Sequence, residues 1–264
     1  MSARPTTAIV TGASTGIGLE LARLLAADGQ HVSLTARDRA RLEAVAAELR
    51  GRHGGEPAVI VADLAEAGAP EAICRQVETA GRDVDVLVNN AGFGSHGPFA
   101  AADLARELAM IRVNVTALVE LTGLVLPGMV QRRAGRILNV ASTAAFQPGP
   151  LMATYYASKA FVLSFSEALA EELRGTGVTV TCLCPGPTRT GFQRRAGVEG
   201  TRVVSGLVPM MDAGAVARLG YRAMRRGGRV AVPGLLNRLG AFAVRLAPRR
   251  LVVGAVRRMH ERPN

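Results

Sequence analysis

Tyr155 and Lys159 form the pair in this sequence best suited to proton-transfer chemistry. They stand four positions apart in a segment that predicts a helix, so their side chains share one helical face. Lys159 is the only lysine among 32 lysines and arginines. An ammonium beside a phenol favours the phenolate and lowers the tyrosine pKa, which would suit Tyr155 to general acid–base catalysis. The alternative is a bias towards arginine that left one surface lysine.

Ser142 and Asn114 precede this pair and add a hydroxyl and an amide. Ser142 follows an expected strand, and the ends of parallel strands face the ligand cleft of an α/β sheet. Its hydroxyl can hold a substrate oxygen, or it can cap the next turn. Asn114 falls inside a predicted long helix, where asparagine is locally unfavourable. It therefore has either a functional role or a satisfied place in the core.

A glycine-rich turn follows the first expected strand, with the sequence Thr11-Gly12-Ala13-Ser14-Thr15-Gly16-Ile17-Gly18. Glycines let the backbone approach a pyrophosphate, and the N–H groups at the start of the next helix favour an anion. The motif predicts dinucleotide binding, and a structural turn is the alternative. The binding residues expected here are Gly12, Ser14, Thr15, Gly16, Ile17 and Gly18.

The end of the second expected strand bears on the choice of cofactor. An enzyme that prefers NAD(H) usually places an acidic residue there to bind the ribose 2′-hydroxyl. Ala36 stands at that point instead, and Arg37 beside it can pair with the 2′-phosphate of NADP(H). Asp38 can cap the next helix or serve a ribose hydroxyl, and Thr15 adds no positive charge. The sequence favours NADP(H) and leaves NAD(H) open.

These motifs require a scaffold, and apolar strands alternate with helical stretches along the chain. The expected strands are Thr7–Thr11, His31–Ala36, Ala58–Val61, Val84–Val88, Arg136–Ala141, Val178–Cys184 and Arg229–Val232. Such alternation predicts an α/β fold with a doubly wound (Rossmann) parallel sheet of seven strands and helices on both faces. No repeat or linker divides the chain, so we expect one domain over residues 1–264.

Together, the motifs and their separations resemble the short-chain dehydrogenase/reductase family over residues 6 to about 233. The resemblance rests on Thr11 to Gly18, Asp63-Leu64, Asn89-Asn90-Ala91-Gly92, Asn114, Ser142, Tyr155 with Lys159, and Pro185-Gly186 with Thr188. The family implies that the serine holds the substrate oxygen, the tyrosine transfers the proton, and the lysine orients the cofactor ribose. It also implies that Asn114 holds a water that links to the lysine.

The resemblance assigns further cofactor contacts. Asp63 would contact adenine, the stretch Asn90 to Gly92 would line the adenosine ribose, and Thr188 would meet the nicotinamide carboxamide. A cap or a turn is the alternative role for each. Beyond the glycine turn, the cofactor residues expected are Arg37, Asp63, Leu64, Asn90, Ala91, Gly92, Tyr155, Lys159, Pro185, Gly186 and Thr188.

The composition indicates the cellular compartment in which the protein works. No apolar run reaches the length needed to span a bilayer, and the short polar start lacks the pattern of a signal peptide. Cys74, Cys182 and Cys184 are too few and too irregular for a disulfide framework, so we expect a reducing, cytoplasmic setting. No set of cysteines and histidines has metal-ligand spacing, so no metal is expected.

The net charge of +11 belongs to the C-terminal part of the chain. Residues 189–264 hold 16 arginines and three acidic residues, and residues 235–264 read as two basic amphipathic helices. We expect this extension to lie peripherally on an anionic membrane surface, to cover the cleft over an apolar substrate, or to form an oligomer interface. Nucleic-acid binding is not expected, because no aromatic platform accompanies the charge.

The sequence thus predicts an NADP(H)-dependent oxidoreductase that transfers a hydride between nicotinamide and a small-molecule carbonyl or secondary alcohol. Residues 190–212 lack periodicity and form the expected substrate loop. Its apolar residues, which favour a ketone, aldehyde or acyl substrate, are Phe192, Val203, Val204, Leu207, Val208, Met210 and Met211.

Several alternatives remain open at this stage. Arg194 and Arg195 allow an anionic substrate such as an acyl thioester of CoA. His96 either borders the pocket or is a solvated loop residue. We expect a homodimer or homotetramer. A cofactor-bound sensor without turnover is a different class of function, which the complete set of asparagine, serine, tyrosine and lysine disfavours.

Overall fold

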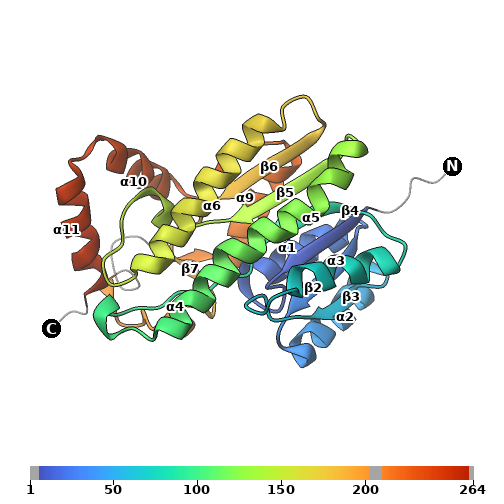
Figure 1. Cartoon of the computed structure of the whole chain (residues 1–264), viewed down its shortest axis with the longest axis horizontal. Coiled ribbons are helices and arrows are strands. Elements are labelled where there is room, and N and C mark those ends of the chain that lie inside the picture. Colours follow the sequence, from blue (N-terminus) through green and yellow to red (C-terminus); the bar gives the residue numbers. More distant parts are fainter. Residues whose placement is uncertain (1–5, 203–209, 262–264) are drawn as a thin grey trace.

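A computed structural model describes residues 6–202 and 210–261 of the chain. Its centre is a parallel sheet with the spatial order β3-β2-β1-β4-β5-β6-β9 (Figure 1). The strands are β1 (Thr7–Thr11), β2 (His31–Ala36), β3 (Ala58–Val61), β4 (Val84–Asn89), β5 (Gly135–Val140), β6 (Val178–Leu183) and β9 (Val230–Ala231). The seven-stranded doubly wound sheet is confirmed, and the strand order turns back between β1 and β4, where such folds bind ligands.

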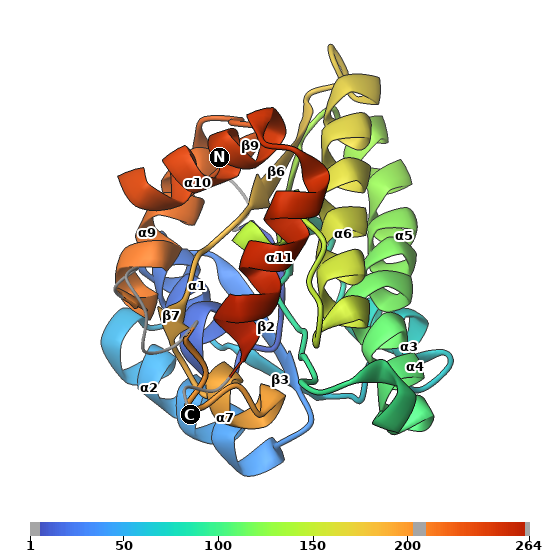
Figure 2. The same ribbon diagram turned by 90° about the vertical axis from the view of Figure 1, so that its left-hand side faces the viewer.

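Helices cover both faces of the sheet. The α-helices are α1 (Gly16–Ala27), α2 (Arg39–His53), α3 (Ala69–Thr79), α4 (Leu104–Ile111), α5 (Ala117–Gln131), α6 (Ala153–Glu172), α7 (Phe192–Ala196), α9 (Ala213–Arg225), α10 (Leu235–Leu246) and α11 (Arg249–His260). Figure 2 shows α5 and α6 on one side of the sheet and α1, α2 and α9 on the other.

The strands supply two core clusters because alternate side chains point to opposite faces. Ala8 and Val10 of β1 pack with residues of α1, α2 and α9, whereas Ile9 packs with residues of α3, α5 and α6. Both faces of the strand are therefore buried. This double burial explains the continuous apolar runs that revealed the strands in the sequence.

α4 and α5 are joined by a π-helical turn, η2 (Arg112–Thr116), into a helical stretch over Leu104–Gln131. This stretch has 28 residues and contains an 18-residue window with a mean hydropathy of 1.6, which would suffice, by length and composition alone, to cross a membrane. The expectation that no apolar segment reaches this length was wrong. Leu121, Val125 and Met129 of α5 lie in the core against the sheet, and this packing accounts for much of the apolar character.

The segment after β6 is more ordered than expected. β7 (Thr188–Arg189) and β8 (Met211–Asp212) pair in parallel, and α7 lies between them in sequence. These strands hold both ends of the expected substrate loop. Of its apolar residues, Val203, Val204, Leu207 and Val208 lie outside the described residues, as do positions 1–5 and 262–264 of the expected single domain.

The turn between β1 and α1 needs glycine for two reasons. Gly12 has φ +65°, a backbone conformation that L side chains rarely adopt. At Gly18 a Cβ would lie 2.3 Å from Nδ2 of Asn90, so a side chain has no room. Asn90 uses that Nδ2 to donate to the carbonyls of Thr11 and Gly12, at 2.9 and 3.2 Å. The glycines thus allow the turn to pack against the end of β4.

Candidate active site

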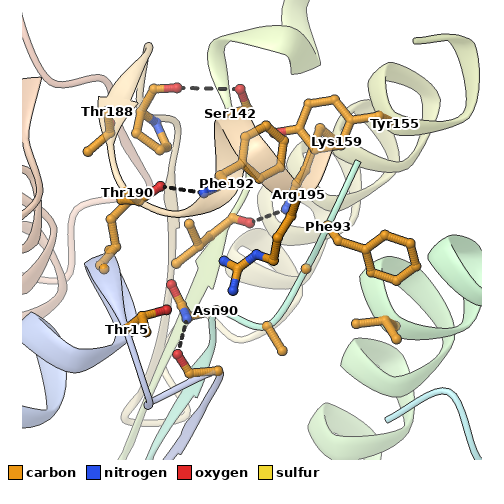
Figure 3. A pocket seen from close by; sticks show the side chains of 18 of the residues that line it. Thr15, Asn90, Phe93, Ser142, Tyr155, Lys159, Thr188, Thr190, Phe192 and Arg195 are labelled. Carbon is orange, nitrogen blue, oxygen red and sulfur yellow. Dashed lines mark hydrogen bonds between the residues drawn. The ribbon is translucent and has the colours of Figure 1, made fainter. Parts of the chain in front are cut away.

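A cavity of about 700 Å³ lies beyond the carboxyl ends of the parallel strands (Figure 3). Of the residues predicted for the site, Gly18 and Asn114 are not part of its wall. The predicted residues that line it are Gly12, Ser14, Thr15, Gly16, Ile17, Arg37, Asp63, Leu64, Asn90, Ala91, Gly92, Ser142, Tyr155, Lys159, Pro185, Gly186 and Thr188. The fold therefore gathers residues from seven separate segments of the sequence around one space.

Ser142, Tyr155 and Lys159 meet on one wall of this cavity, from the end of β5 and from α6 (Figure 3). Both α6 residues are buried. Nζ of Lys159 lies 5.9 Å from the centre of the Tyr155 ring and donates to the Val140 carbonyl at 2.8 Å. Two hydroxyls and an amine therefore lie together at this wall, and the tyrosine and the lysine are largely shielded from solvent.

Ser142 also caps the short helix that follows β5, η3 (Thr143–Phe146). Its Oγ accepts a hydrogen bond from the Ala144 amide at 3.1 Å and donates to the Pro185 carbonyl at 3.4 Å. The two roles considered for this serine are thus compatible. The cap fixes the side chain on the cavity wall, where the hydroxyl can meet a ligand.

Burial opposes charge on both members of the tyrosine–lysine pair. It raises the pKa of Tyr155 to about 12, while a side-chain interaction with Ser142 works in the opposite direction. It lowers the pKa of Lys159 to about 8. The tyrosine pKa below 10 expected from the sequence is therefore not found, because desolvation of the phenol dominates. At neutral pH the site holds a protonated phenol and an amine that can give up its proton.

Asn114 lies in the π-helical turn η2 and is buried behind the cavity wall. Its Oδ1 accepts from the Phe93 amide at 3.1 Å, and its Nδ2 donates to the Phe93 carbonyl and to Oγ of Ser158, both at 3.0 Å. A Cβ on Gly92 would stand 3.0 Å from this Oδ1 and 3.4 Å from Nζ of Lys159. Asn114 therefore holds the chain after β4 close beside the lysine.

The start of α1 is open towards the cavity. Thr15 occupies the N-cap position but makes no side-chain capping hydrogen bond, and Gly16 and Ile17 line the cavity. The first N–H groups of a helix have no partners within the helix. Together with its positive dipole end, they make this turn a fitting cradle for the pyrophosphate of a dinucleotide.

Arginines line the end of the cavity beside β2. Arg37 pairs with Asp63 at 3.7 Å, while Asp38 caps α2 by accepting from the Arg41 amide at 3.1 Å. Arg195 extends from α7 into the same cavity (Figure 3). Burial, followed by repulsion from Arg37 and Arg41, lowers the pKa of the Arg195 guanidinium. Guanidinium groups that repel one another around a cavity fit an anionic ligand.

His260, at the end of α11, is a residue of the cavity wall that was not predicted from the sequence. This buried ring is hydrogen-bonded through Nε2 to the Tyr156 hydroxyl at 2.7 Å, and His96 donates to its backbone carbonyl at 2.8 Å. His96 is thus half-buried and anchors the C-terminal helix. Tyr156 anchors this helix as well. No local pattern could predict a contact across 104 residues.

Comparison with known proteins identifies the family of the chain. The family model for short chain dehydrogenases matches residues 6–199.

The chain belongs to the short-chain dehydrogenase family.

Relatives of this dehydrogenase include the very-long-chain 3-oxoacyl-CoA reductase of Laccaria bicolor, which is 42% identical over 175 residues. That match covers 66% of this chain and 52% of the relative, so the chain spans about half the length of this relative. The ketoacyl reductase HetN of Nostoc sp. is 33% identical over 213 residues, with 80% and 74% coverage. The family match ends at residue 199, before α9, although the sequence suggested a resemblance to about residue 233.

Solved structures of the family are also similar to this dehydrogenase. A short-chain dehydrogenase from Sphingobium yanoikuyae in complex with NADPH is 34% identical, with a TM-score of 0.81 and coverage of 90% and 92%. The bulky-bulky ketone specific alcohol dehydrogenase of Comamonas testosteroni is 28% identical, with a TM-score of 0.78 and coverage of 92% and 94%. The similarity in structure extends further along the chain than the family match.

We expect the docking of α11 in this dehydrogenase to weaken in acid. Burial, with a smaller effect of His96, lowers the pKa of His260 to about 4, so the docked helix favours the neutral ring. An undocked histidine has a pKa of about 6.5, so docking is complete above that pH and weakens progressively as the pH falls towards 4.

Hydrogen exchange of the α11 amides, corrected for intrinsic rates, measures this effect. The wild-type chain should lose protection between pH 7 and pH 5, and His260→Gln should remove the pH dependence. Equal protection of wild-type α11 at both pH values would contradict the expectation.

Proposed function

We propose that this dehydrogenase transfers a hydride between NADP(H) and a carbonyl or secondary-alcohol carbon of an apolar, acyl-type substrate. The observation that carries the proposal is the convergence of Ser142, Tyr155 and Lys159 on a cavity whose far end is lined by arginines. A bound nicotinamide cofactor would supply or accept the hydride. The side chains of the protein bind and orient the reactants and move the proton.

Tyr155 and Ser142 act at the substrate oxygen. In the reducing direction, negative charge develops on that oxygen and a proton must reach it. Burial keeps Tyr155 protonated at neutral pH, so its hydroxyl can donate this proton. The Ser142 oxygen is held by the Ala144 amide, and its hydrogen would turn from the Pro185 carbonyl to the same substrate oxygen. General acid catalysis of this kind is worth on the order of 10²–10⁴-fold in rate.

Lys159 acts beside the tyrosine rather than on its hydroxyl. Its amine is held by the Val140 carbonyl and faces the Gly92 backbone, where it would hold the cofactor ribose. A pKa of about 8 leaves it mostly charged at neutral pH and still able to exchange a proton. Arginine could not exchange a proton in this way. Asn114 is a positioning residue, because it fixes Phe93 and not the reacting atoms.

The arginines beside β2 support NADP(H) over NAD(H). Ala36 offers no carboxylate to a ribose hydroxyl, and Asp38 is committed to capping α2. Arg37, Arg41 and Arg195 would instead bind the 2′-phosphate. The related structure from Sphingobium yanoikuyae, which holds NADPH, adds support. Charge-assisted hydrogen bonds from guanidinium to phosphate are worth about 1.5–3 kcal/mol.

The wall near Tyr155 supports an apolar substrate. Side chains that line this part are Phe93, Met152, Tyr156, Phe192 and Val198. The Phe192 ring lies 5.2 Å from that of Tyr155, centre to centre. Relatives named as 3-oxoacyl-CoA and ketoacyl reductases make a 3-oxoacyl thioester the substrate of choice for a first assay. The homodimer or homotetramer stays a prediction.

Replacing Tyr155 by phenylalanine should remove the proton donor and leave the cavity almost unchanged. We expect turnover of NADPH with a 3-oxoacyl thioester to fall by about 10²–10⁴-fold, while NADPH binding, measured by fluorescence, changes little. Tyr221→Phe is the matched control, because Tyr221 packs in the core beside α1, where its hydroxyl donates to Asp28, and is not part of the cavity wall. This variant should keep normal turnover. Near-normal turnover of Tyr155→Phe would refute the assigned role.

Replacing Arg37 and Arg41 together by alanine should weaken the binding of NADPH more than the binding of NADH. We expect the KM for NADPH to rise by about 10–100-fold, from the lost hydrogen bonds to phosphate, and the KM for NADH to change little. Arg39→Ala is the control, since Arg39 pairs with Glu43 at 3.6 Å and is not part of the cavity wall. Equal effects on both cofactors would show that these arginines do not read the 2′-phosphate.

A further inference from the structure

α10 turns its large apolar side chains towards solvent. None of its residues is buried. Five of its side chains are between 55% and 74% exposed, namely Leu235, Leu236, Leu239, Phe242 and Leu246. At 3.6 residues per turn these positions share one side of the helix. An amphipathic helix on the surface of a globular protein usually has the opposite orientation, with its apolar side packed against the core.

The opposite side of α10 is the one that contacts the rest of the protein. Val244 packs against the cluster that holds Tyr155 and Tyr156. Nδ2 of Asn237 donates to the Pro233 carbonyl at 2.7 Å, and a Cβ on Gly186 would lie 2.4 Å from the Asn237 side chain. The helix therefore contacts the protein through the side that carries Asn237 and Val244. The exposed leucines lie on the other side and do not belong to the core.

α11 places arginines beside this apolar face. Val252, Val256 and His260 of α11 are buried against the protein, which leaves its other side outward. Exposed arginines of the two helices are Arg238, Arg245, Arg249, Arg250, Arg257 and Arg258. Over the described part of the chain, an ion-pair partner for these six is found only for Arg257, which lies 3.4 Å from Glu261.

α10 and α11 lie together on one face of the molecule, which is turned to the viewer in Figure 2 and forms the left end of Figure 1. We name the exposed apolar and arginine side chains of these two helices the basic apolar face. Beneath it, Val252 and Val256 pack in the same cluster as Met152 and Tyr155, and His260 lines the cavity. The basic apolar face therefore adjoins the substrate side of the site.

We propose that the basic apolar face binds the surface of an anionic phospholipid bilayer. The apolar side of α10 would enter the headgroup region, and the arginines would pair with lipid phosphates. A second copy of the chain fits less well, because a two-fold interface would set this arginine cluster against itself. The inference goes beyond the proposed function and does not depend on it, since it rests only on exposure and charge.

Co-sedimentation of the full chain with phospholipid vesicles tests the proposal. The chain should pellet with vesicles of phosphatidylglycerol and phosphatidylcholine in equal parts, and much less with phosphatidylcholine alone, and salt should weaken the binding. Arg238→Gln with Arg245→Gln should lower the partition coefficient on the order of 25-fold, from about fivefold for each charge near the surface. Equal binding to both vesicle types, or binding to neither, would overturn the proposal.

Matched substitutions of apolar residues distinguish binding through the basic apolar face from nonspecific hydrophobic adsorption to vesicles. Leu239→Ser with Phe242→Ser should abolish binding to the anionic vesicles. Leu108→Ser with Phe161→Ser removes the same residue types from α4 and α6, where they are 44% and 42% exposed, and should leave binding intact. Loss of binding in this control pair would overturn the assignment. So would a dimer, found by sedimentation velocity without lipid, that dissociates on Leu239→Ser with Phe242→Ser.

Discussion

The buried amine of Lys159 is the constraint on which the rest of the site depends. An amine can leave water only if its hydrogen bonds are met, and here the Val140 carbonyl at the end of β5 meets one of them. A side chain on Gly92 would crowd Oδ1 of Asn114 and approach the amine, and Asn114 holds the chain beyond Gly92. The sheet, helix α6 and the chain that follows β4 thus fix the position of the Lys159 amine together.

The cavity around this amine changes in character from one end to the other. Open N–H groups of α1 and the arginines near Arg37 suit the anionic part of a dinucleotide. Beyond Tyr155 the wall becomes apolar, and the end of α11 closes part of it through His260. The same C-terminal helices that complete the substrate side also carry the basic apolar face. Substrate binding and attachment to a lipid surface would therefore share one structural unit.

Much of the fold and the site could be predicted from the sequence because the signals are local. Strands buried on both faces give short apolar runs, and Tyr155 with Lys159 lies within one turn of a helix. Two features could not be predicted. The contact between Tyr156 and His260 joins distant segments, and the raised pKa of Tyr155 depends on burial rather than on spacing. Desolvation becomes visible only when the surrounding elements are in place.

The single lysine of the chain makes a direct measurement of its pKa possible. Protein labelled with carbon-13 at the ε position of lysine gives one side-chain signal in a nuclear magnetic resonance titration. A midpoint near pH 8 is the result expected for the buried amine beside Tyr155. A midpoint near the ordinary value of 10.5 would show that Lys159 is solvated and would contradict the account of the site.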